Sequence, residues 1–114
     1  MAYLDENGLS YLWSKILSKI LYANYGTCTT AGDIAQKEVT ISSLSNLTDA
    51  DLKPGLFIFV RFSNANAVAN PTLKLNNLTA KAIKRYGTTA PSTSNTSSWY
   101  AGATVLLIYD GTYW

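Results

Sequence analysis

Hydrophobic and polar positions change their spacing along the chain after Gly26. Before that point apolar side chains recur every three or four positions, a spacing that gathers them on one side of an α-helix. This apolar stripe consists of Leu9, Leu12, Trp13, Ile16, Leu17, Ile20 and Leu21. Asp5 or Asn7 can cap the start of the helix, and Gly26 can end it. The pattern predicts an amphipathic helix over about residues 7–23.

The apolar stripe covers roughly half of the helix circumference, which is wider than a coiled-coil seam requires. In one interpretation the helix lies against the β domain of its own chain. In the other it packs against copies of itself about a symmetry axis. We favour the second, because so broad a stripe on a short helix needs cover on two sides. Two heptads are too few to associate strongly alone, so the rest of the chain must contribute.

After Gly26 the spacing becomes typical of β-strands. Residues 38–42 alternate between apolar and polar, and residues 56–62 are nearly all apolar, as in a strand covered on both faces. Residues 104–109 form a further predicted strand. The following Asp110-Gly111 predicts a hairpin that turns the chain back on itself.

A second hairpin is predicted between residues 72–75 and 79–86, with its turn at Asn76-Asn77. Asparagine tolerates the left-handed backbone conformation that tight hairpins require. Six or seven short strands after one helix predict a mainly β fold, a small antiparallel β-sandwich or barrel. We therefore expect an oligomerisation helix over residues 1–26 and an antiparallel β domain over residues 27–114.

Composition narrows the classes of function. The chain has 114 residues, of which 47% are hydrophobic and only 14% are charged, with a net charge of +2. Average soluble domains carry about 25% charged residues, so neutral side chains must supply the polar surface here. Without a clustered basic face we expect no nucleic-acid binding. The longest apolar runs fall far short of the ~20 residues that span a bilayer, so we expect no membrane insertion.

Catalytic chemistry has little support in the residues. The chain has no histidine, and its single cysteine, Cys28, excludes an intrachain disulfide and is expected to be a small buried side chain. Asp49 and Asp51 lack the further ligands that a calcium loop places at fixed offsets. No imidazole is present to activate the many serine and threonine hydroxyls. We expect no catalytic residue, no metal and no cofactor, and hence no enzyme.

Aromatic residues beside the polar segment 87–98 are the remaining candidates for binding. Rings flanked by asparagine, serine and threonine are typical of sugar-binding surfaces, where a ring face meets the C–H face of the sugar and neutral polar groups bind its hydroxyls. Tyr86, Trp99 and Tyr100 are the predicted glycan-binding residues. The alternative is that these rings belong to the core or to a subunit interface.

Four segments carry a resemblance to a known family: residues 3–16, 25–37, 60–76 and 109–114. The most specific of them joins a phenylalanine-containing strand, the loop Asn64-Ala-Asn66 and the strand that begins Asn70-Pro-Thr-Leu73. Together they resemble tail-fibre or related virion structural proteins of phages and prophages of Gram-positive, often gut, bacteria. The resemblance implies a homotrimeric virion appendage, with the helix near the three-fold axis and other virion proteins as partners.

The resemblance also sets the expected function. It implies a non-enzymatic tail-fibre or receptor-binding protein, assembled in the cytoplasm of the bacterial host, that contributes to attachment to a bacterial cell-surface glycan. A capsid head-fibre or decoration protein is the alternative, and a polysaccharide depolymerase is the third. Family members commonly continue past the last strand, so the chain is either complete or the front part of a longer fibre.

Overall fold

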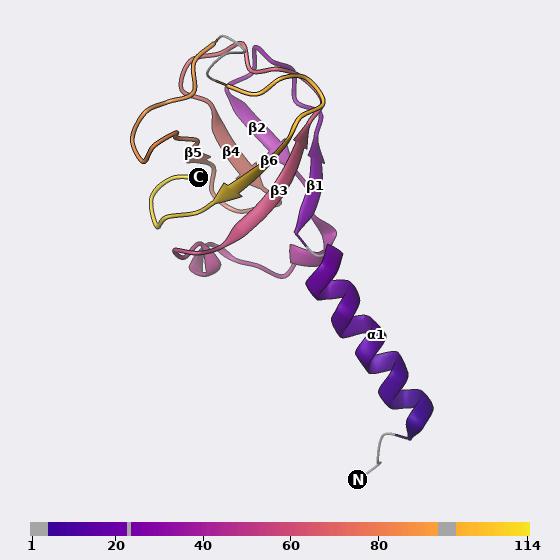
Figure 1. Cartoon of the computed structure of the whole chain (residues 1–114). Coiled ribbons are helices and arrows are strands. Elements are labelled where there is room, and N and C mark those ends of the chain that lie inside the picture. Colours follow the sequence, from indigo (N-terminus) through magenta and orange to yellow (C-terminus); the bar gives the residue numbers. More distant parts are fainter. Residues whose placement is uncertain (1–4, 23, 94–97) are drawn as a thin grey trace.

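A computed structural model of the chain describes residues 5–22, 24–93 and 98–114, with the side chains of residues 18–22 left undescribed. The described residues form one α-helix, six strands and two short 3-10 helices, η1 (Ser42–Leu44) and η2 (Asp49–Asp51). The predicted mainly β fold with one α-helix is therefore confirmed. The helix, α1 (Glu6–Tyr22), projects from the β domain beside the first strand, β1 (Tyr25–Cys28) (Figure 1). The molecule is elongated, with extents of 57, 28 and 22 Å along its principal axes.

Capping by Asp5 sets the start of α1. The Gly8 N–H donates to the Asp5 carboxylate over 2.6 Å, and the acidic side chain of Glu6 lies in the positive first turn. The helix therefore begins where the predicted cap places it and ends at Tyr22, within a residue of the prediction. Within the described part of the chain, no helix combines the length and apolar content needed to cross a membrane.

We predicted that Gly26 ends the helix, and this prediction is wrong. Gly26 lies inside the first strand, β1 (Tyr25–Cys28). A Cβ at this position would lie 2.7 Å from Ile41 Cγ1 and 2.8 Å from Val39 Cγ2, closer than real Cβ contacts. The glycine is therefore required because β1 passes directly over two core side chains, a long-range contact that local spacing does not reveal.

The strands form two sheets of three. Sheet A contains β1, β3 (Phe57–Phe62) and β6 (Thr104–Ile108) in the order β1-β3-β6. Sheet B contains β2 (Gln36–Val39), β4 (Thr72–Leu75) and β5 (Lys81–Ala82) in the order β2-β4-β5.

The prediction of a purely antiparallel fold is wrong, because each sheet is mixed. β1 runs parallel to β3, and β2 runs parallel to β4, while β6 and β5 are antiparallel to their neighbours. No closed barrel forms among the described strands. Turn signals report only pairings between consecutive strands, whereas both parallel pairs join strands that are separated by a long crossover.

Two strand predictions also change in the structure. β3 alternates between buried and exposed residues, with Ile58 and Val60 inside and Phe57 and Phe59 outside. The expectation that this strand is covered on both faces is therefore wrong. The hairpin between β4 and β5 is confirmed, with Asn76 in the left-handed conformation at φ 51°, although β5 is only two residues long.

The chain end joins the two sheets. The Asp110 carboxylate accepts hydrogen bonds from the N–H groups of Thr112 and Tyr113, and Gly111 has φ 106°, so the predicted turn is present. The chain then leaves sheet A. The Trp114 N–H donates to the Ala82 carbonyl over 2.9 Å, so Trp114 pairs beside β5. The predicted hairpin required Trp114 to pair with β6, and this part of the prediction is wrong.

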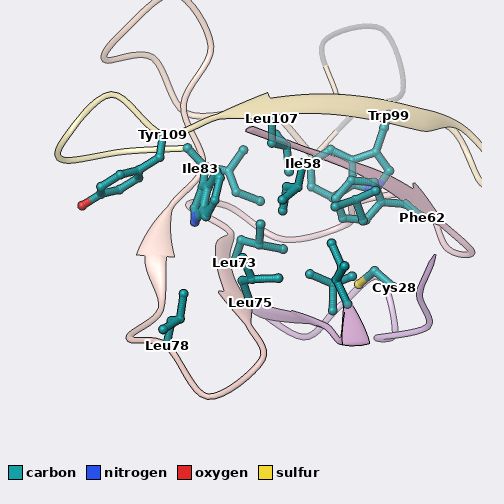
Figure 2. Packing of buried hydrophobic residues seen from close by; sticks show 14 residues of the cluster. Cys28, Ile58, Phe62, Leu73, Leu75, Leu78, Ile83, Trp99, Leu107 and Tyr109 are labelled. Carbon is teal, nitrogen blue, oxygen red and sulfur yellow. The ribbon is translucent and has the colours of Figure 1, made fainter. Parts of the chain in front are cut away.

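The core lies between the two sheets (Figure 2). Alternate residues of β3 and β4 point into it, and Trp99 stacks on Phe62 with ring centroids 4.1 Å apart. Cys28 is fully buried and free, which confirms the prediction of a small buried side chain. The core consists of Cys28, Val39, Ile41, Ile58, Val60, Phe62, Leu73, Leu75, Leu78, Ile83, Trp99, Leu107, Tyr109 and Trp114.

Candidate functional site

The first candidate surface is the apolar stripe of α1. Leu9 and Trp13 are more than half exposed, Leu12 and Ile16 are also exposed, and Leu17 is half-buried. The side chains of Ile20 and Leu21, which complete the predicted stripe, lie outside the described part of the chain. The β domain of the same chain therefore leaves Leu9, Leu12, Trp13 and Ile16 exposed, which does not fit the first interpretation of this helix.

Asn24, two residues after the end of α1, is bonded to sheet A. Its side-chain Nδ2 donates to the Phe57 carbonyl over 2.8 Å, and its backbone carbonyl accepts from the Phe59 N–H over 2.6 Å. Both bonds are made to β3, the central strand of sheet A. The residue that precedes β1 is thus held on the sheet.

A second exposed surface, the outer face of sheet A, was missed by the sequence reasoning. It carries Tyr25, Phe57, Phe59, Leu106 and Ile108, which are 41–53% exposed. The sequence signal was the nearly continuous apolar run over residues 56–62, which we assigned to a strand covered on both sides. In the structure sheet B covers only one side, so the same apolar run leaves an exposed apolar face.

The predicted glycan-binding residues do not form one surface. Trp99 is only 6% exposed, stacks on Phe62, and its Nε1–H donates to the Asn64 carbonyl over 3.0 Å. A sugar needs an accessible ring face, so the burial of Trp99 fits the core alternative stated for these rings, and its glycan binding stays a prediction. Tyr86 and Tyr100 are 86% and 59% exposed, and their glycan binding stays a prediction.

Tyr86 is held at the tip of a tight loop. Arg85 and Thr89 exchange backbone hydrogen bonds across it, and Tyr86 has a positive φ of 50°, which is rare for a bulky residue. The Arg85 guanidinium lies 4.9 Å from the Tyr86 ring centroid and donates to its hydroxyl over 3.2 Å. The loop therefore presents an outward ring with a cation beside it.

A cavity of about 270 Å³ lies between this loop and β6. Its wall combines two basic side chains with apolar groups, and Ser98 Oγ is buried there without a hydrogen-bond partner in the described structure. The volume is slightly below the roughly 300–1,000 Å³ of ligand pockets, so the cavity suits a small polar group. It is lined by Ile83, Lys84, Arg85, Pro91, Ser98, Trp99, Val105, Leu106 and Leu107.

Lys37 is the one fully buried basic side chain among the described residues. It is 1% exposed, and its Nζ donates to the carbonyls of Ala31 and Gly32, each over 3.0 Å. Burial removes water from the ammonium group and lowers the pKa of Lys37. Both hydrogen bonds go to the loop that precedes β2, so this lysine holds that loop onto the strand.

The carboxylates of Asp49 and Asp51 bind different partners. Asp49 accepts from the side chain and backbone of Thr79 over 2.6 and 2.8 Å, and these bonds lower its pKa. Asp51 accepts from the Thr48 N–H in a capping box. Across residues 5–22, 24–93 and 98–114, no three His, Cys, Asp or Glu side chains come together as a metal site would require.

No family model, curated protein or solved structure matches the chain. What indicates a function is therefore the fold, the exposed surfaces of α1 and sheet A, and the resemblance carried by the sequence.

Proposed function

We propose that the chain is a non-enzymatic structural protein of a phage virion, of the tail-fibre or receptor-binding type, that assembles as a homotrimer and contributes to attachment to the bacterial surface. The observation that carries the proposal is the exposed apolar stripe on a helix that projects from the β domain. The sequence resemblance supports the virion assignment and the three-fold symmetry.

The physical reason for assembly is the cost of the exposed stripe. Fully burying a large apolar side chain contributes about 1.5–3 kcal/mol, and the stripe exposes Leu9, Leu12, Trp13 and Ile16. A helix of 17 residues is also only marginally stable in water without tertiary cover. Packing α1 around a symmetry axis supplies this cover for every copy at once.

Attachment is assigned to the loop side of the β domain. Tyr86 exposes its ring there, and Arg85 and Ser98 line the adjoining cavity, while the exposed Tyr100 is a separate candidate. A ring face combined with hydrogen-bond donors suits a carbohydrate, which presents C–H faces and hydroxyl groups. The proposed ligand is a bacterial cell-surface glycan.

Light scattering at micromolar concentration tests the assembly. We expect the mass of a trimer for the wild-type chain and a smaller species for Trp13→Glu, which places a charge in the stripe. Tyr11→Glu is the matched control, because Tyr11 is an exposed residue on the opposite side of α1. A wild-type monomer would refute the proposed trimer.

Whole-cell binding across candidate hosts, with soluble wall polysaccharide as competitor, tests the attachment. We expect binding that the polysaccharide competes away, and a weaker signal for Tyr86→Ala in an intact trimer. Binding to phage capsids with no binding to cells would instead support a head-fibre or decoration protein. Release of new reducing ends from wall glycan would support a depolymerase.

A further inference from the structure

The outer face of sheet A is organised in rows that run across its strands. Tyr25, Phe59 and Leu106 face one another in one row, and Phe57 and Ile108 form the neighbouring row. All five side chains are 41–53% exposed, and the rings of Phe57 and Phe59 meet edge to face with centroids 6.3 Å apart. These two apolar rows form a continuous exposed patch, and such patches mark interaction surfaces.

The opposite end of the same face is polar. In register beyond the apolar rows lie Thr27, Arg61 and Thr104, all exposed. Because β1 begins directly after the helix, the apolar rows lie at the end of the sheet nearest α1 and the polar row lies farther away (Figure 1). The apolar surface of α1 is thus followed by an apolar surface on the adjacent part of the sheet.

The short connection between α1 and sheet A limits how far apart these surfaces can lie in an assembly. The helix ends at Tyr22 and β1 begins at Tyr25, so their Cα atoms are at most about 11 Å apart. Asn24, which directly precedes β1, is bonded to the backbone of Phe57 and Phe59, so the start of the β domain lies at the apolar rows. Three helices that meet at an axis therefore bring the apolar ends of three sheets close to that axis.

The chemistry of the patch suits contact with copies of itself. Its two apolar rows contain no acid or base, so placing one copy beside another creates no like-charge pair. Aromatic residues are enriched and charged residues depleted at the centres of protein interfaces, and Tyr25, Phe57 and Phe59 fit that composition. The described part of α1 spans 17 residues, too few to hold a trimer strongly without additional contact area.

We propose that the outer face of sheet A, at Tyr25, Phe57, Phe59, Leu106 and Ile108, packs against neighbouring copies of this chain and forms the second part of the trimer interface. The proposal rests on the proposed trimeric function and extends the interface from α1 into the β domain. The occupant of the face is the corresponding end of sheet A in the other two copies.

Sedimentation velocity over a concentration series tests this interface with paired variants of one strand. Leu106→Glu places a charge in the apolar rows, and Thr104→Glu places the same charge two residues away on the same face. We expect Leu106→Glu to raise the concentration of half-assembly at least about ten-fold, and Thr104→Glu to leave it nearly unchanged. Far-UV circular dichroism verifies that both variants are folded.

Cross-linking provides a second measurement that does not depend on a destabilising charge. Phe59→Cys supplies a reactive thiol in the apolar rows, while the native Cys28 is buried and makes the wild-type chain the background control. We expect a short bis-maleimide to join Phe59→Cys chains in the trimer and to join Thr104→Cys chains far less.

The outcomes separate this inference from the trimer itself. A monomeric wild-type chain overturns both proposals. A trimer that dissociates with Trp13→Glu, but assembles normally with Leu106→Glu and gives no cross-link at Phe59→Cys, retains the helix interface and overturns the sheet interface. Loss of assembly with Leu106→Glu in a folded chain, together with cross-linking at position 59, supports the inference.

Discussion

Replacement of Trp99 separates a core role from a binding role. The side chain is 6% exposed and stacked on Phe62, so Trp99→Ala removes nearly a full indole from the core. Large-to-small changes of this kind cost about 3–5 kcal/mol, which includes the cavity that remains. The Nε1–H bond to the Asn64 carbonyl adds about 0.5–1.5 kcal/mol to the loss. Small domains are stable by only about 5–15 kcal/mol, so a large part of the folding free energy is removed.

Thermal and urea unfolding at one fixed protein concentration measure this effect, because assembly makes the midpoint depend on concentration. We expect Trp99→Ala to lower Tm by about 12–25 °C. Trp99→Phe keeps a ring against Phe62 and loses the hydrogen bond, so we expect a loss of about 1–3 kcal/mol. Phe62 itself stays unchanged in both variants.

Tyr100→Ala is the matched control, since the neighbouring ring is 59% exposed and should change stability by less than about 0.5 kcal/mol. Reduced cell binding by the folded Trp99→Phe variant, with unchanged stability, would refute the core role. An unfolding midpoint for Trp99→Ala equal to that of the wild type would refute it as well.

Three further predictions concern the packing around Gly26 and the lowered pKa values of Asp49 and Lys37. Gly26→Ala should cost about 1–3 kcal/mol in urea unfolding, and Val39→Ala should recover part of that loss in the double variant, because the new Cβ collides with Val39; additive losses would contradict the packing argument. The lowered pKa of Asp49 means that its bonds to Thr79 contribute stability above about pH 3.9, and that this contribution disappears as the pH falls through the lower folded pKa. Asp49→Asn should therefore flatten the acid side of the Tm profile, and an unchanged profile would count against it. The lowered pKa of Lys37 means that the folded chain gives up this proton more easily than the unfolded chain, so its contribution to stability rises with pH toward about 10.4. The stability of Lys37→Met relative to the wild type should then fall between neutral and alkaline pH, and a constant difference would refute the prediction.

Local features of this chain were predictable because they depend on residues close together in the sequence. The three-and-four spacing from Leu9 onward and the Asp5 cap specify α1 within a residue or two. The β4–β5 hairpin follows from the left-handed preference of Asn76. The existence of these elements therefore needed no knowledge of the remainder of the molecule.

The burial of Trp99 and the exposure of its neighbour Tyr100 could not be predicted from the local sequence. Trp99 is 6% exposed and its neighbour Tyr100 is 59% exposed, but the sequence does not say which of the two rings enters the core. Phe62 and Asn64, 35 or more residues earlier in the chain, decide it by taking the indole into the core. The burial of Trp99 therefore fits the core alternative for this ring.

By itself the sequence determined the helix, its apolar stripe, most of the strands and the lack of charge that disfavours nucleic-acid binding. Only the tertiary structure decided the parallel pairings of β1 with β3 and of β2 with β4, which join strands far apart in the chain. It also decided that β3 is covered on one side only, which leaves Phe57 and Phe59 exposed beside the end of α1. The spacing of apolar residues indicates which side chains are more stable when buried from water. The arrangement of the sheets decides which of these side chains are buried within a single chain.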